Sequence, residues 1–133
     1  MIPITRPAVG EEEAMAAAAA VRSGWLSQGP RVQEFERLIA ARVGAKHAIA
    51  TSNCTTALHL ALREAGVGPG DEVICPSFSF IATANAVLHC GGTPVFVDIE
   101  PDSYNIDPAL IEALITPRCH GSARRRRSGR ARS

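Results

Sequence analysis

The stretch Thr51-Ser52-Asn53-Cys54-Thr55-Thr56-Ala57-Leu58 decides the fold because it joins a predicted strand to a predicted helix. Residues 45–50 alternate and are largely apolar, which predicts a buried strand, and the apolar spacing that follows predicts a helix to about Ala65. The first N–H groups of a helix lack intrahelical partners and carry partial positive charge, so a phosphate can bind there among hydroxyls. An ordinary N-cap by Ser52 or Asn53, with no ligand, explains the same residues.

The rest of the chain alternates helices and strands. Apolar spacing, capping residues and Gly/Pro turns predict helices at 11–23, 31–43, 81–89 and 107–115, and further strands at 72–75 and 95–98. Short turns between alternating elements are typical of an α/β fold with a parallel sheet and right-handed crossovers. Ligands of such sheets bind beyond the carboxyl ends of the strands.

A second strand-to-helix junction, Ser77-Phe78-Ser79-Phe80, is predicted at the same edge of the sheet. It offers an aromatic face, from Phe78 or Phe80, to a ligand whose phosphate is held at the first junction. A phosphate beside a flat ring favours a phosphorylated aromatic cofactor or a nucleotide. The chain contains neither G-x-G-x-x-G nor G-x-x-x-x-G-K-[ST], which disfavours a dinucleotide or a P-loop nucleotide.

Charge is distributed unevenly along the 133 residues. Residues 1–117 hold seven Lys and Arg against 13 acids, a net charge of −6, whereas residues 118–133 hold seven Arg and no acid, a net charge of +7. Apolar residues make up 46% of the chain, which is enough for a core. The length allows at most one domain, or a piece of one.

The four cysteines show no C-x-x-C pair and no histidine at zinc spacing, so we expect reduced thiols and no metal site. The first residues lack the basic and apolar regions of a secretory leader. The alanine-rich run at 14–21 is too short to span a membrane. A cytoplasmic location is the resulting expectation.

The only tryptophan lies in the predicted loop Trp25-Leu26-Ser27-Gln28-Gly29-Pro30. Tryptophan is common both as a core filler and at binding surfaces. From the residues alone, the loop therefore fits either a filled core gap or the lining of a site or subunit contact.

Many blocks of the sequence resemble, in one order, the DegT/DnrJ/EryC1/StrS family of pyridoxal-phosphate-dependent sugar aminotransferases. The blocks that carry this resemblance are residues 24–30, 35–36, 51–58, 68–74, 76–80, 82–86, 94–98, 105–108 and 115–118. It covers residues 1 to about 118 and implies the N-terminal portion of a fold type I large domain, mainly parallel sheet with flanking helices. It also implies amino-sugar and polysaccharide biosynthesis, a nucleotide-linked keto-sugar substrate, an amino acid donor and a homodimer.

The resemblance also implies roles for individual residues. Thr55 and Thr56 match positions whose amides and hydroxyl hold the cofactor phosphate, and Asn53 and Cys54 flank them. Phe80 matches the aromatic residue that stacks on the pyridine ring. The loop residues implied near the active site at the dimer interface are Trp25, Ser27, Gln28, Gly29 and Pro30.

Pyridoxal-phosphate chemistry needs a Schiff-base lysine and a carboxylate on the pyridine nitrogen. The family's lysine and carboxylate come after the part of the chain that matches. Lys46 is the only lysine, and it is expected on the opposite edge of the sheet as a solvated side chain. Asp98 is expected to be structural. Cys54 lies at a helix start, where a thiol pKa can fall, but no base stands at a motif spacing for nucleophilic catalysis.

Residues 119–133 do not continue the pattern, and their arginines favour disorder over a buried strand. We interpret them as the product of a shifted reading frame in a GC-rich gene. The chain is therefore expected to be a truncated aminotransferase that does not transaminate by itself. The alternative is a nucleic-acid-binding protein that uses the arginines to contact phosphates.

Overall fold

The computed structural model describes residues 6–119 and divides the chain into two compact units, Met1–Ala50 and Thr51–Ser133. The boundary predicted near residue 118 stays a prediction, because residues 120–133 lie outside the described part. Among residues 6–119, no helix is long and apolar enough to cross a bilayer.

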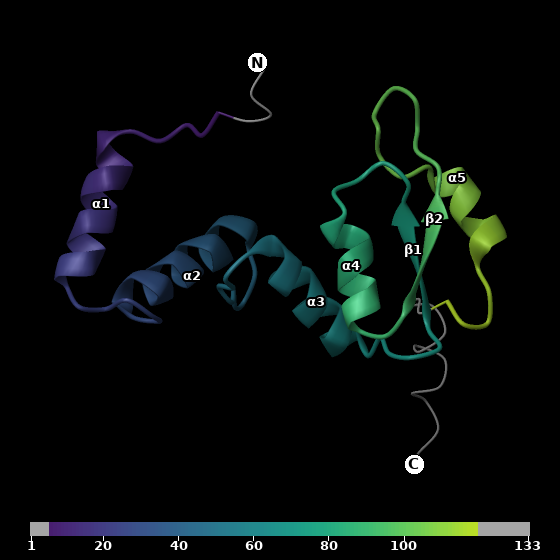
Figure 1. Ribbon diagram of the computed structural model, residues 1–133, viewed down its shortest axis with the longest axis horizontal. Helices are drawn as coiled ribbons and strands as arrows, with labels where there is room; N and C mark the ends of the chain where they lie inside the picture. Colours follow the sequence, from purple (N-terminus) through teal and green to yellow (C-terminus); the bar gives the residue numbers. More distant parts are fainter. Residues whose placement is uncertain (1–5, 120–133) are drawn as a thin grey trace, which may run out of the picture. The chain divides into compact units, whose positions relative to one another are not determined.

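The first unit consists of two helices, α1 (Glu11–Arg22) and α2 (Pro30–Val43), as the sequence predicted (Figure 1). Three glutamates occupy the first turn of α1, where acids suit the helix dipole. Pro30 begins α2, and Gly44 ends it in the left-handed conformation with φ 68°. Neither helix buries a residue.

The strand predicted within residues 45–50 is wrong: these residues are irregular. A strand exists only where a neighbour completes its ladder of hydrogen bonds, and none of the residues 6–119 pairs with this segment. The Glu36 carboxylate of α2 instead accepts the N–H of Ala50 at 2.8 Å. Apolar alternation identified a segment suited to a strand, but pairing depends on a partner that the segment's own sequence cannot reveal.

The second unit is built from α3 (Cys54–Ala65), β1 (Glu72–Pro76), α4 (Ala82–His89) and β2 (Thr93–Val97). The strands β1 and β2 pair in parallel, with Glu72 opposite Thr93 and Pro76 opposite Val97. This arrangement confirms the parallel sheet with a helical crossover. The predicted helix at 107–115 divides into α5 (Pro108–Ile111) and a 3₁₀ turn (Glu112–Leu114), and Asp107 caps its start by accepting the N–H of Ala109 at 2.8 Å.

Small side chains form the core of this unit, where α4 lies against both strands and beside α3 (Figure 1). The buried apolar residues are Val67, Cys75, Ala82, Ala84, Ala86, Val87, Cys90 and Val97. Small residues let the helix approach the sheet closely. Gly92 is one such residue, because a Cβ there would lie 3.2 Å from side-chain carbons of both Val67 and Val87.

Glu72 anchors the end of the described chain to the start of β1. Its buried carboxylate accepts a hydrogen bond from the Thr116 hydroxyl and pairs with the Arg118 guanidinium. Its N–H donates to the Arg118 carbonyl at 2.8 Å, and Glu72 forms a parallel bridge with Cys119. The pairing of β1 is therefore shared between β2 and residues 118–119.

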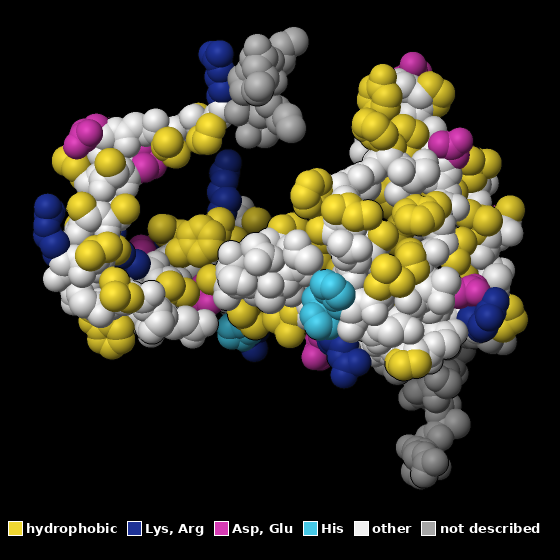
Figure 2. Space-filling model, in the orientation of Figure 1, with side chains coloured by type: hydrophobic (Ala, Val, Ile, Leu, Met, Phe, Trp, Pro, Cys, Tyr) yellow, Lys and Arg dark blue, Asp and Glu magenta, His cyan; other side chains and the backbone are white. Residues whose placement is uncertain are grey.

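Many apolar side chains remain exposed in both units. Figure 2 shows hydrophobic side chains spread over the visible face of the second unit, and the exposed set includes Phe78, Phe80, Ile81, Phe96 and Tyr104. Exposed apolar areas of this kind mark surfaces that bind ligands or other protein segments.

Candidate functional site

The start of α3 is organised by Asn53, which is the N-cap residue. Its Oδ1 accepts the Thr56 N–H at 2.9 Å and the Thr56 hydroxyl at 3.1 Å. The Ser52 hydroxyl lies 3.2 Å from the Thr56 hydroxyl and accepts a 3.3 Å hydrogen bond from the Asn53 amide nitrogen. Of the two capping residues that the sequence left open, the structure therefore selects Asn53.

Two backbone N–H groups at this helix start have no hydrogen-bond acceptor within the described part of the chain. Among residues 6–119, no group accepts a hydrogen bond from the N–H of Cys54 or of Thr55. The first turn contains no acidic residue, so the partial positive charge of the helix end has no counter-charge from α3 itself. Cys54 and Thr56 are exposed and Thr55 is half-buried, which leaves the donors and hydroxyls open to a ligand. The donor set fits a phosphate, for which free N–H groups and hydroxyls are the usual partners.

The second junction, Ser77 to Phe80, follows the carboxyl end of β1 as predicted. The Ser77 N–H donates to the Val97 carbonyl at 2.8 Å, and its hydroxyl donates to Asp98 Oδ1 at 3.3 Å. At the other end of the junction, the Ser79 hydroxyl lies 2.9 Å from the Thr83 hydroxyl of α4. Hydrogen bonds thus hold both ends of this short segment.

The two aromatic rings of this junction have different surroundings. Phe78 contacts the ring of Tyr104, with centroids 5.8 Å apart and planes inclined at 44°. Phe80 is 79% exposed and makes no aromatic ring contact within residues 6–119. Both rings are exposed, Phe78 to 68%, and Phe80 differs in being the more exposed of the two and in having no ring partner among the described residues.

The predicted meeting of the two junctions at one sheet edge stays a prediction. Both belong to the second unit, but only Ser77–Phe80 follows a strand of its sheet, because the strand expected before α3 is not formed. Within residues 6–119, no hydrogen bond or ring contact joins the two junctions.

The loop around Trp25 lines a cavity of about 290 Å³ in the first unit. Its lining residues are Ala20, Ser23, Trp25, Ser27, Gly29, Pro30, Arg31 and Val32. Trp25 is 61% exposed, so it does not fill a core gap. Gln28 is the one member of the predicted loop site that does not line the cavity.

The remaining chemical candidates have structural explanations. Asp98 Oδ1 accepts hydrogen bonds from the Ser77 hydroxyl and from the Ile99 N–H, which agrees with the structural role expected for it. Burial raises the pKa of the Cys75 thiol, so that thiol is poorly suited to be a nucleophile. In the described part of the chain, all four cysteines are free, and no three His, Cys, Asp or Glu side chains gather to hold a metal ion.

Tyr104 was missed by sequence reasoning. It lies 26 positions after its ring partner Phe78, and no periodic pattern connects a loop residue to such a distant contact. The backbone conformation of Tyr104 could not be predicted from the sequence either, because a φ of 57° is unusual for an aromatic residue.

Comparisons with known proteins agree on one family. The model of the DegT/DnrJ/EryC1/StrS aminotransferase family matches residues 7–123. The chain is 52% identical over 117 residues to the spore coat polysaccharide biosynthesis protein SpsC of Bacillus subtilis, covering 88% of this chain and 30% of that protein. It is 58% identical over 95 residues to the GDP-perosamine synthase of Caulobacter vibrioides, covering 71% and 26%.

Solved structures support the same relationship. The PLP form of Spr1654 from Streptococcus pneumoniae matches with a TM-score of 0.80 and 37% identity, over 89% of this chain and 30% of that one. NtdA from Bacillus subtilis with bound cofactor PMP matches with a TM-score of 0.77 and 38% identity, over 84% and 26%. The chain therefore spans about 30% or less of the length of these relatives.

Proposed function

Because the chain belongs to the DegT/DnrJ/EryC1/StrS aminotransferase family, we propose that it carries the phosphate- and ring-binding part of a pyridoxal-phosphate-dependent sugar aminotransferase. The observation that carries this proposal is the start of α3, where two backbone donors stand free beside three capping and hydroxyl side chains. Pyridoxal phosphate, when bound, supplies an electron sink for chemistry at the substrate.

The chain's own residues divide the binding task. The resemblance implied the amides and hydroxyl of Thr55 and Thr56 as phosphate contacts, but the Thr56 N–H already donates to Asn53 Oδ1. We therefore assign the N–H groups of Cys54 and Thr55 to the cofactor phosphate, with the hydroxyls of Ser52 and Thr56 beside them. Asn53 orients Thr56 through two hydrogen bonds and keeps the first turn in place. Phe80 offers the exposed aromatic face on which the pyridine ring stacks.

The loop of Trp25, Ser27, Gln28, Gly29 and Pro30 takes part in substrate binding or in a homodimer contact. Its exposed tryptophan and the cavity beside it support this role. The substrate class is a nucleotide-linked keto-sugar, with an amino acid as donor. A GDP-perosamine synthase and a UDP-4-amino-4-deoxy-L-arabinose–oxoglutarate aminotransferase among the relatives support that class.

Binding and turnover are separate in this polypeptide. Lys46 is the only lysine of the 133 residues, and it precedes the phosphate site on the irregular segment before Ala50. Apart from Lys46, no lysine is present to hold the cofactor covalently. We therefore propose that these 133 residues bind the cofactor phosphate and do not transaminate.

The test removes a single backbone donor. Proline is well suited to the first position of a helix, and Asn53 before it is already extended, with φ −165° and ψ 170°. Cys54→Pro therefore deletes one N–H and keeps the helix, whereas Cys54→Ala keeps the N–H and serves as the matched control. Calorimetric titration uses pyridoxamine 5′-phosphate and inorganic phosphate, because the amine form cannot condense with Lys46.

We expect Cys54→Pro to lower the affinity for both probes by about 10- to 100-fold, which is the range for the loss of one hydrogen bond to a charged group. Cys54→Ala should bind both probes as the unchanged chain does. Equal binding by both variants, or no binding by the unchanged chain, would overturn the phosphate role of α3.

A further inference from the structure

The residue Tyr104 has a backbone conformation that aromatic residues rarely adopt. Its φ is 57°, and among residues 6–119 it is the only residue other than glycine with a positive φ. The loop around it is closely hydrogen-bonded: the Tyr104 N–H donates to the Glu100 carbonyl at 3.0 Å, and the Glu100 N–H donates to the Asn105 carbonyl at 2.9 Å. A bulky side chain held in this region points to a function when its surroundings enforce it.

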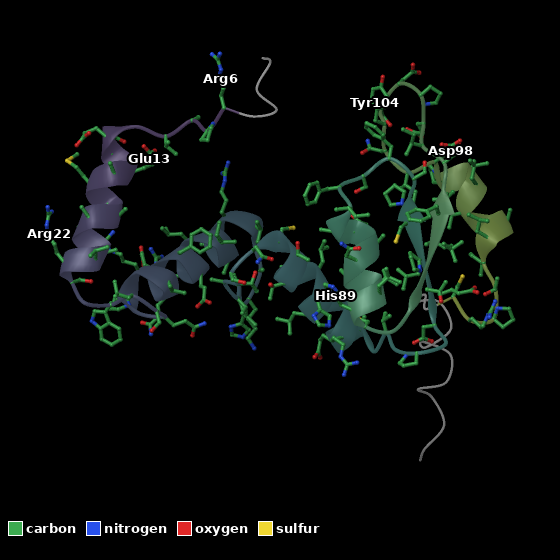
Figure 3. The ribbon with its side chains drawn as sticks, in the orientation of Figure 1. Arg6, Glu13, Arg22, His89, Asp98 and Tyr104 are labelled. Atoms are coloured by element: carbon green, nitrogen blue, oxygen red, sulfur yellow. The ribbon has the colours of Figure 1, made fainter. Side chains whose placement is uncertain are left out.

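The ring of Tyr104 is held against the second junction. Figure 3 shows Tyr104 in the loop beyond β2 and Asp98 near the end of that strand. Tyr104 contacts Phe78 at a centroid distance of 5.8 Å, and Asp98 accepts the hydroxyl hydrogen bond of Ser77 at 3.3 Å. One loop therefore contacts two successive residues of the segment that leads to Phe80.

Phe80 itself depends on this segment for its position. Its carbonyl accepts the Thr83 N–H at 3.0 Å, which fixes the side of the junction that enters α4. The side that leaves β1 is fixed by the loop after β2. The Phe78–Tyr104 ring pair lies on the surface, with exposed fractions of 68% and 62%, so burial alone does not explain it.

We infer that Tyr104 is a positioning residue that sets the direction of the Phe80 ring through Phe78. The inference rests on the proposed function, because the ring of Phe80 matters only where a flat ligand stacks on it. Tyr104 does not touch the ligand in this arrangement. Tyr104 therefore influences the binding of the cofactor ring and does not influence the binding of the phosphate at α3.

The test uses two substitutions at Tyr104. Glycine adopts a φ of 57° freely, so Tyr104→Gly keeps the loop backbone and removes only the ring. Tyr104→Phe keeps the ring and removes the hydroxyl, as the conservative control. Each is titrated with pyridoxamine 5′-phosphate and with inorganic phosphate, and each is also made in combination with Phe80→Ala.

We expect Tyr104→Gly to lower the affinity for pyridoxamine 5′-phosphate by about 2- to 12-fold, the range that corresponds to the loss of one aromatic pair. Inorganic phosphate should bind unchanged, and Tyr104→Phe should restore the affinity of the amine probe. In the Phe80→Ala background, Tyr104→Gly should have no further effect, because the two residues act as one unit.

The failures are distinguishable. If Phe80→Ala weakens the amine probe but Tyr104→Gly does not, the positioning role is overturned and the proposed function stands. If Tyr104→Gly lowers the affinity for both probes equally, or lowers it as much in the Phe80→Ala background as in the unchanged chain, the substitution disturbs the fold as a whole. The inference is then wrong. If the unchanged chain binds neither probe, the proposed function is overturned and the inference with it.

Discussion

The helices α1 and α3 begin in opposite ways. The first turn of α1 carries three glutamates, and Glu13 Oε2 accepts the Gly10 N–H at 2.7 Å. The first turn of α3 carries no acid and is capped by the neutral side chain of Asn53. The start of α1 therefore has an anion from its own chain, whereas the phosphate site proposed at α3 has none to compete with it. The glutamates of α1 supply the counter-charge to its helix dipole, whereas the first turn of α3 contains no acidic side chain to do so.

The largest expected effect comes from giving α3 an acid in its first turn, as α1 has. Thr56 occupies the position in α3 that Glu13 occupies in α1, three residues after the N-cap. Thr56→Glu should weaken pyridoxamine 5′-phosphate on the order of 100-fold or more, because like charges about 4 Å apart repel by roughly 4 kcal/mol near a protein surface. The helix itself should be at least as stable, since an acid there suits the dipole.

Thr56→Gln is the matched control for that experiment. It keeps the length and hydrogen-bonding capacity of glutamate without the charge, so its loss of affinity should be much smaller. Titration measures affinity, and thermal unfolding followed by circular dichroism measures the helix. A Thr56→Glu variant that still binds the probe tightly would show that the phosphate does not lie at α3.

The helix α2 begins in a third way, because its N-cap is Gly29, which has no side chain and is buried. A Cβ at Gly29 would lie 2.9 Å from Trp25 Cε3, whereas a Cβ at Gly10, the N-cap of α1, meets nothing closer than 3.7 Å. Gly10→Ser should stabilise the chain by a few tenths of a kcal/mol. Gly29→Ser should destabilise it by about 1 kcal/mol, because the tryptophan must move.

Trp25 reports directly on that second substitution, since it is the only tryptophan of the chain. Its fluorescence emission should shift in Gly29→Ser and stay unchanged in Gly10→Ser, with urea unfolding measuring the stability of both. If both serines stabilise the chain and the emission is constant, Gly29 is replaceable and the packing of Trp25 against it has no energetic role.

The smallest expected effect is a difference in pH response. The hydrogen bond from Gly10 holds the pKa of Glu13 below its ordinary value of 4.5. A carboxyl group with a lowered pKa stabilises the fold above its unfolded pKa, and this contribution is lost as the pH falls through the lower, folded value. The start of α1 should therefore loosen in acid below the ordinary glutamate range, whereas the Asn53 cap has no titratable group.

Amide chemical shifts followed by NMR from pH 7 to acid give the measurement. The Gly10 amide should titrate with the Glu13 carboxyl, and the Thr56 amide should not follow that transition. Glu13→Gln is the control and should abolish the titration of Gly10. A Gly10 amide that titrates equally in this variant would contradict the assignment.

Much of the second unit could be read from the sequence. Apolar spacing, Gly66 after α3 and Pro108 at the start of α5 placed these helices within a few residues, because such signals are local. The parallel pairing of β1 and β2 followed from a crossover through α4. The strand predicted within residues 45–50 is not formed, because a strand needs a hydrogen-bonding partner that its own sequence does not reveal.

The candidate site also has some features that local sequence predicts and others that depend on packing. The polar start of α3 could be predicted from residues 51–58 alone, because capping residues, hydroxyls and the lack of an acid are local properties of that stretch. The packed structure was needed to show that Asn53 rather than Ser52 caps α3, and that Phe78 has Tyr104 as a ring partner while Phe80 has none within residues 6–119. The physical reason is that local hydrogen bonding depends on neighbours along the chain, whereas exposure and ring contacts depend on how distant segments pack.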